Sequence, residues 1–112
     1  MKRIAAVLIA LLVAFLIASS LHAAPGDVAA GKAMFAKKCA MCHGAAGEGK
    51  ESMAKMLKVE IKHMGSKEVQ AVKDEELAKI TKEGKGKMKG VAGLSDADVA
   101  NLVAFIRTLK TK

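Results

Sequence analysis

The chain has 112 residues and a formal net charge of +8, so it is long enough for one small domain and strongly basic. An apolar fraction of 52% excludes a disordered polyelectrolyte. Aromatic residues make up only 3%, with no Tyr and no Trp, which argues against single-stranded nucleic-acid binding because such sites stack bases on aromatic rings.

The amino-terminal segment has the layout of a secretory signal peptide. After a basic start, an unbroken apolar run from Ile4 to Ala18 leads through small residues to a cleavage site near Ala23 or Ala24. An uncleaved membrane anchor is the alternative, but the run is shorter than the roughly 20 residues that span a bilayer. We therefore expect residues 1–24 to be cleaved off on export, and residues 25–112 to form one domain in the periplasm.

The first half of this domain is predicted to contain two helices. Asp27 is a plausible N-cap, and the helix that follows should run into Cys39, with Gly31 allowing a close contact. Its apolar residues at helical spacing are Val28, Met34 and Phe35. The three glycines of residues 44–50 predict a loop. A short helix over Ser52–Leu57 should then present an apolar side formed by Met53, Met56 and Leu57.

The middle of the domain is predicted less sharply. Residues 58–65 show no clear pattern. Ser66 is placed to cap a brief turn through Val72, and Asp74 to cap a helix from Glu75 to about Glu83. Two glycines end that helix, and residues 84–93 read as a second glycine-rich loop.

The last helix is the clearest in the chain. Ser95-Asp96-Ala97-Asp98 resembles a capping box. The apolar face that follows is formed by Val99, Leu102, Val103, Phe105, Ile106 and Leu109. Because no stretch alternates convincingly between apolar and polar residues, the sequence predicts an all-α domain.

Both cysteines lie in one motif, Cys39-Ala40-Met41-Cys42-His43. A disulfide or a redox dithiol is one interpretation, but a redox C-x-x-C belongs beside a βαβ pattern that is missing here. A structural zinc site would need four ligands, and no second Cys pair or His pair exists. The histidine directly after the second cysteine makes this the attachment signal of c-type haem, whose vinyl groups take the two thiols while the imidazole reaches the iron.

From Asp27 to Leu109 the chain resembles the small monohaem class I cytochromes c, of the bacterial cytochrome c5/c6-like type. The matching stretches are GKAMFAKKCAMCHG (31–44), DEELAKITKEGKGKM (74–88) and LSDADVANLVAFIRTL (94–109). The resemblance implies an all-α class I cytochrome c fold: three main helices, with short helices and loops, around one covalently bound haem c. It also implies that the first and last helices cross near Gly31/Phe35 and Leu102/Phe105.

The resemblance further implies Cys39 and Cys42 as the thioether anchors, His43 as the proximal iron ligand and Met88 as the distal one. Met88 lies in the second glycine-rich loop, before the last helix, and its thioether would favour ferrous iron. The family usually has proline directly after this methionine, where the present chain has Lys89. The rival distal ligands are Met53, Met56, His63 and Met64.

The same four rivals also admit a copper(I) site of soft ligands. Methionines beside a large flat cofactor more often fill irregular gaps in the core. We therefore expect core packing rather than a copper site, with His63 exposed.

Lysines gather in sequence around the motif and the predicted loops, and Lys85, Lys87 and Lys89 bracket Met88. They predict either a basic rim that steers acidic redox partners or ordinary solvated surface. Such partners would be membrane oxidase or reductase complexes or other electron carriers. We expect a monomer that makes at most peripheral contact with a membrane and binds no nucleic acid.

The predicted function is that of a periplasmic one-electron carrier rather than an enzyme. With both axial positions filled by His43 and Met88, no position remains for substrate. The alternative is a five-coordinate haem protein for gas sensing or peroxide chemistry, and a docking subunit of a larger oxidoreductase is a third possibility.

Overall fold

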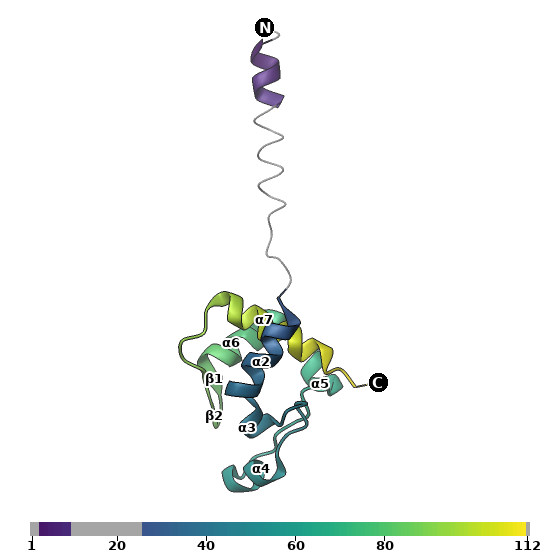
Figure 1. Cartoon of the computed structure of the whole chain (residues 1–112), viewed down its shortest axis with the longest axis vertical. Helices are drawn as coiled ribbons and strands as arrows, with labels where there is room; N and C mark the ends of the chain where they lie inside the picture. Colours follow the sequence, from purple (N-terminus) through teal and green to yellow (C-terminus); the bar gives the residue numbers. More distant parts are fainter. Residues whose placement is uncertain (1–2, 10–25, 112) are drawn as a thin grey trace.

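The computed structural model describes residues 3–9 and 26–111 (Figure 1). Residues 3–9 form a short helix with exposed apolar side chains, and the predicted cleavage site lies outside the described residues. The elements of the domain are α2 (Val28–Lys38), α3 (Ala40–His43), α4 (Glu51–Leu57), α5 (Lys67–Gln70), α6 (Asp74–Glu83), β1 (Gly84–Lys85), β2 (Met88–Lys89) and α7 (Asp96–Thr108). Within the described ranges, no helix is both long enough and apolar enough to cross a membrane.

Helix α2 begins where the sequence predicts. The Asp27 side chain accepts a hydrogen bond from the backbone N–H of Ala30, and the helix ends at Cys39, whose N–H donates to the Phe35 carbonyl. Phe35 is buried, but Val28 is 43% exposed and does not belong to the core. Val28 lies in the first turn of α2, on its exposed side.

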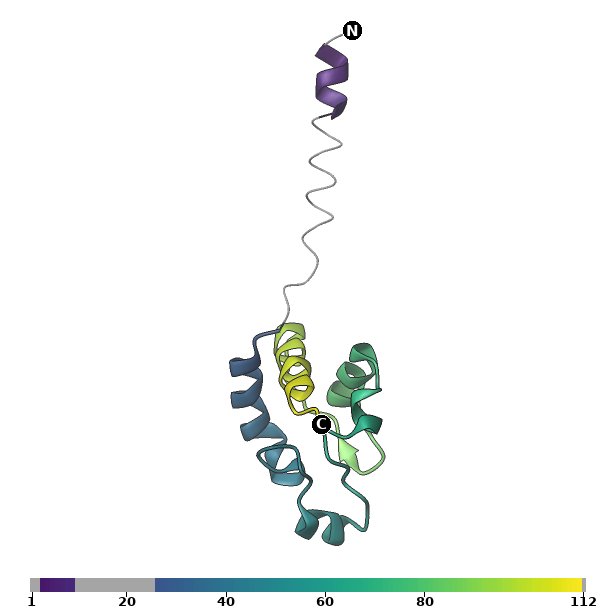
Figure 2. The ribbon, with the colours of Figure 1, turned by 90° about the vertical axis from the view of Figure 1, so that its right-hand side faces the viewer.

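Helices α2 and α7 lie side by side, with α6 on the other side of α7 (Figure 2). A Cβ atom at Gly31 would lie 1.9 Å from the carbonyl oxygen of Asn101, so only glycine allows this approach. The rings of Phe35 and Phe105 meet edge-on with their centroids 5.1 Å apart. The predicted crossing is confirmed, and the buried core gathers around it: Phe35, Leu77, Leu102, Val103, Phe105 and Ile106.

The segment before α6 is tied to α7 by polar contacts. Arg107 donates to the Gln70 carbonyl at 2.9 Å and to the Asp74 carboxylate at 2.7 Å. The Gln70 amide donates in turn to the carbonyls of Met64 and Ile106. Asp74 was expected to cap α6 but is its first helical residue, with Lys73 at the N-cap. Its carboxylate is engaged by Arg107 instead of the backbone.

A short hairpin stands where the sequence predicts a plain loop. Strands β1 and β2 pair antiparallel, with Gly84 opposite Lys89 and Lys85 opposite Met88. The tight turn is possible because Gly86 has a φ of 58°, a conformation that glycine adopts without steric cost. Strands of two residues are too short to show alternation, so the hairpin leaves no pattern in the sequence. The domain is otherwise the predicted all-α fold.

Candidate functional site

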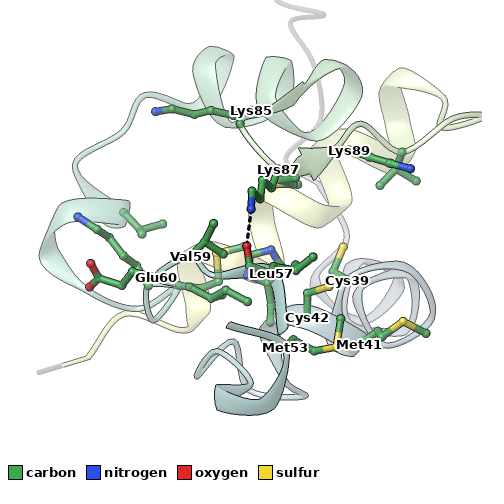
Figure 3. A pocket seen from close by; sticks show the side chains of 18 of the residues that line it. Cys39, Met41, Cys42, Met53, Leu57, Val59, Glu60, Lys85, Lys87 and Lys89 are labelled. Atoms are coloured by element: carbon green, nitrogen blue, oxygen red, sulfur yellow. Dashed lines mark hydrogen bonds between the residues drawn. The ribbon is translucent and has the colours of Figure 1, made fainter. Parts of the chain in front are cut away.

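A cavity of about 790 Å³ opens between the end of α2, the α4 region and the hairpin (Figure 3). Its lining is mainly apolar and includes every residue of the predicted site: Cys39, Cys42, His43 and Met88. The structure therefore brings together two segments that lie far apart in the sequence.

The two cysteines reach the same cavity because the chain turns tightly between them. Cys39 ends α2, and the single turn α3 follows, with the N–H groups of Cys42 and His43 donating to the Cys39 carbonyl at 3.2 and 3.0 Å. Both thiols are free and half-buried. Burial, and secondarily the nearby Cys42, raises the pKa of the Cys39 thiol. Two reduced thiols on one wall are what a divinyl group requires.

The surroundings of His43 suit a metal-binding imidazole. Its ring lies 6.4 Å from that of Phe35, centroid to centroid, and its Nδ1 atom is buried without a hydrogen-bond partner among the described residues. Burial lowers the pKa of the imidazole, which favours the neutral form that binds metals. Hydrogen bonds from Gly49 to the His43 carbonyl and from Lys50 to the Cys42 carbonyl hold this turn in place.

The glycine-rich segment 44–50 is the predicted loop, and Glu48 organises it. The Glu48 carboxylate accepts a hydrogen bond from the Ala46 N–H at 2.9 Å. A Cβ atom at Gly44 would collide with that carboxylate. The Gly47 carbonyl accepts from the Met64 N–H, which brings Met64 to the cavity. The sequence gives no signal for Glu48, because an exposed glutamate in a loop is ordinary.

The rival distal ligands do not gather at one point. Met53 and Met64 line the cavity with Met88, whereas Met56 and His63 do not line it. Met56 is 66% exposed, so the predicted apolar side of α4 is only partly buried. His63, which was expected to be exposed, is half-buried, and its Nδ1 accepts a hydrogen bond from the Gly65 N–H at 2.8 Å. Two of the four residues considered for a copper(I) site therefore line the cavity and two do not, so they do not form one ligand set.

The three lysines that bracket Met88 all lie along the cavity, but they differ in their contacts. Lys87 Nζ donates a hydrogen bond to the backbone carbonyl of Leu57 at 2.6 Å. All three are exposed, and in Figure 3 the Lys85 and Lys89 side chains run to either side of the bond that Lys87 makes. No sequence pattern predicts the Lys87 contact, since it joins residues 30 positions apart.

The residues present fit a covalently attached haem. The cavity is within the size range of cofactor sites and mostly apolar, as a large flat macrocycle requires. Two thiols stand beside an imidazole whose Nδ1 has no partner in the described part of the chain, and the thioethers of Met53, Met64 and Met88 also reach the lining. Among the described residues of the lining, His43 is the only histidine and no arginine is present.

Comparisons with known proteins agree with this arrangement. The sequence model of the family described as cytochrome c matches residues 28–110. The chain is 36% identical to cytochrome c-554(547) of Halothiobacillus neapolitanus over 91 residues, which is 76% of this chain and 99% of that protein. It is 36% identical to cytochrome c6 of a Picosynechococcus species over 110 residues, 95% of this chain and 92% of that protein. The solved KustC0563 c-type cytochrome has a similar fold, with a TM-score of 0.63 and 24% identity over 72% of this chain and 98% of its own.

Proposed function

This chain belongs to the cytochrome c family and binds haem c covalently, and on that premise we propose that it is a periplasmic one-electron carrier with His43 and Met88 as axial ligands. The observation that supports this proposal best is the cavity that joins the Cys39–His43 turn to the hairpin carrying Met88. The bound group supplies a reversible one-electron change at its iron.

The chain's own residues hold the group and control access to it. Cys39 and Cys42 would anchor it through thioether bonds, which fixes its orientation in the cavity. The neutral imidazole of His43 would ligate one face of the iron, as its lowered pKa favours. The lining is mainly apolar, and burial of the group in such surroundings would help to set the reduction potential.

We propose Met88 as the iron ligand on the face opposite His43. A thioether is a soft ligand that favours ferrous iron and raises the potential. Met88 comes from a hairpin in which a Cβ atom at the Gly86 turn would meet no described atom within 4 Å, so its position can adjust without distorting a helix. Met53 belongs to α4, and Met64 is held by the Gly47 carbonyl.

The partner of such a carrier would be an acidic redox protein. The cavity is bordered by exposed Lys85 and Lys89, and positive charge at this site would attract a negatively charged docking surface. We propose that the carrier is a monomer that meets its partner by diffusion. Peripheral contact with anionic lipid is compatible with the same charges.

The ferric and ferrous spectra with a redox titration test this function. We expect a low-spin ferric protein with a sulfur-to-iron charge-transfer band and a reversible one-electron wave. A protein with an open iron site would instead be high-spin and bind carbon monoxide rapidly when reduced. That result would favour the second candidate, a five-coordinate gas-sensing or peroxide protein. A distal histidine or arginine in the described lining would have supported that candidate.

A further inference from the structure

One hydrogen bond crosses the cavity from the hairpin to the far end of α4. It runs from Lys87 Nζ to the carbonyl oxygen of Leu57, and both residues line the cavity. Figure 3 shows the Lys87 side chain turned toward α4 along this bond. Among the described residues, no other hydrogen bond joins residues 84–91 to residues 45–63. Within the described residues, this is therefore the one hydrogen bond that joins these two walls of the site.

The acceptor is well suited to an ammonium group. Helix α4 ends at Leu57, and Lys58 closes it in a left-handed conformation with a φ of 56°. As the last carbonyl of α4, that of Leu57 has no donor inside the helix, and the Lys58 N–H turns back to the carbonyls of Ala54 and Lys55. Carbonyls at this end of a helix carry partial negative charge and favour a cation.

The hairpin itself has little else to hold it. Each strand has two residues, and such a hairpin is marginally stable alone. At its base, the Val91 N–H donates to the Thr81 carbonyl at 2.9 Å, and Gly90 lies against the backbone of Lys82. At its tip, a Cβ atom at Gly86 would meet nothing within 4 Å. Motion of the tip would carry Met88 with it.

We propose that Lys87 is a positioning residue, a latch that holds the hairpin over the cavity and so keeps the Met88 sulfur at the iron. The proposal rests on the proposed function, because it takes Met88 as the distal ligand. It separates the three lysines by role: Lys87 holds the site closed, while Lys85 and Lys89 remain available to a partner.

The matched experiment compares Lys87→Ala with Lys85→Ala in the haem-loaded protein. Each variant removes one positive charge from the same hairpin, but only the first removes the hydrogen bond. Imidazole is titrated into the ferric protein while the sulfur-to-iron band is followed, since imidazole binds only when the sulfur has left. Because the bond is charge-assisted but exposed, we expect Lys87→Ala to bind imidazole about 3- to 10-fold more tightly. Lys85→Ala should match the wild type, and Lys87→Arg should restore most of the wild-type affinity.

Hydrogen exchange provides a second measurement that does not depend on ligation. Loss of the latch should speed exchange of the hairpin amides, including Met88, in Lys87→Ala and leave Lys85→Ala unchanged. Equal behaviour of the two variants in both measurements would overturn the proposal. If Met88→Ala keeps the sulfur-to-iron band, the proposed ligation fails and the positioning role fails with it. Exchange would then report separately whether the hairpin is latched.

Discussion

Four methionines line the cavity, and three of them, Met53, Met64 and Met88, are candidates for the distal ligand, so its identity depends on single residues. We expect Met88→Ala to lose the sulfur-to-iron band and to bind external ligands. Its potential should fall by an amount on the order of 0.1 V, within the ~0.8 V range that axial ligands span. The matched variants Met53→Ala and Met64→Ala should keep the band. Loss of the band in either of these, and not in Met88→Ala, would reassign the ligand.

The stability of the fold in acid also depends on a single residue, Glu48. Its own backbone N–H and that of Ala46 hold the pKa of the Glu48 carboxyl below its ordinary value of 4.5. The unfolded chain therefore takes up this proton at a higher pH than the folded protein does. The carboxylate stabilises the fold above pH 4.5, and that contribution disappears as the pH falls through the lowered pKa.

We predict that Glu48→Gln lowers the melting temperature at pH 7 and that its curve meets the wild-type curve near the acid end. Thermal melts of the haem-loaded protein at pH 7, 5 and 3 measure this. Glu60→Gln is the control, because Glu60 is exposed and no hydrogen bond to its side chain is found among the described residues. A constant difference between Glu48→Gln and wild type at all three pH values would contradict the explanation.

At the scale of elements, the crossing of α2 and α7 depends on a missing side chain. A Cβ atom at Gly31 would lie 1.9 Å from the Asn101 oxygen and 3.0 Å from the Phe105 Cβ atom. Since the first of these is backbone, the helices themselves must separate. We expect Gly31→Ala to lower the free energy of unfolding by about 1–3 kcal/mol, the usual cost of overpacking. Denaturant titration of the haem-loaded protein measures this.

The neighbouring exposed residue Ala30 supplies the control for this substitution. Ala30→Ser adds one heavy atom to the same helix and should change stability by no more than about 0.5 kcal/mol, as is usual at the surface. If Gly31→Ala proved as mild as Ala30→Ser, the close approach of α2 and α7 would not hold in solution.

How far the sequence predicts these elements depends on how local each signal is. The caps at Asp27 and Ser95 are formed by residues within three positions, so both are predicted correctly. Asp74 has the same type of signal, but Arg107 engages its carboxylate from 33 positions away. The hairpin was missed because its strands are shorter than any period that a pattern can show.

The candidate site divides in the same way. The motif from Cys39 to His43 is contiguous, so its five residues are enough to predict haem attachment. The glycine-rich context of Met88 also points to it, although the sequence does not exclude Met53 or Met64. The latch between Lys87 and Leu57 depends on the turn of the hairpin and on the end of α4 together. Such a contact is known only once the fold is known.

At the scale of the whole molecule, the domain is built around a cavity of about 790 Å³. A chain of this size buries a limited apolar core, and the cofactor fills part of what would be the core. We predict that Cys39→Ala combined with Cys42→Ala loses the haem and leaves a largely unfolded chain, because the remaining contacts do not offset the conformational entropy. Far-ultraviolet circular dichroism and urea titration test this. A cooperative transition in the double variant would show that the domain folds without its cofactor.

The exposed charges of the hairpin should act on the rate of electron transfer and only weakly on the potential, because solvent screens surface charges well. Reversing the charges of the other two hairpin lysines, with Lys85→Glu and Lys89→Glu, should slow oxidation by the ferricyanide anion. It should speed oxidation by a cationic cobalt(III) complex. Both effects should fade above about 0.1 M salt, where the Debye length is ~10 Å.

Stopped-flow rates from low to high salt measure both reactions, with Lys110→Glu as the control for total charge. Equal effects of the hairpin and control variants, after allowance for charge number, would mean that electrons leave the haem elsewhere on the surface.

The pairing of α2 with α7 also affects the order in which the chain folds and receives its cofactor. The Asp27 N–H donates to the Asn101 side chain 74 positions later, so the first helix of the domain obtains its partner almost last. At the ~5–20 residues per second of protein synthesis, that separation corresponds to about 4–15 s. During this interval Cys39, Cys42 and the side of α2 that bears Phe35 would be uncovered. Since the haem-free chain is expected to stay largely unfolded, α2 and α7 would pair stably only after the haem is attached, and the attachment apparatus would meet open cysteines even once α7 has been made.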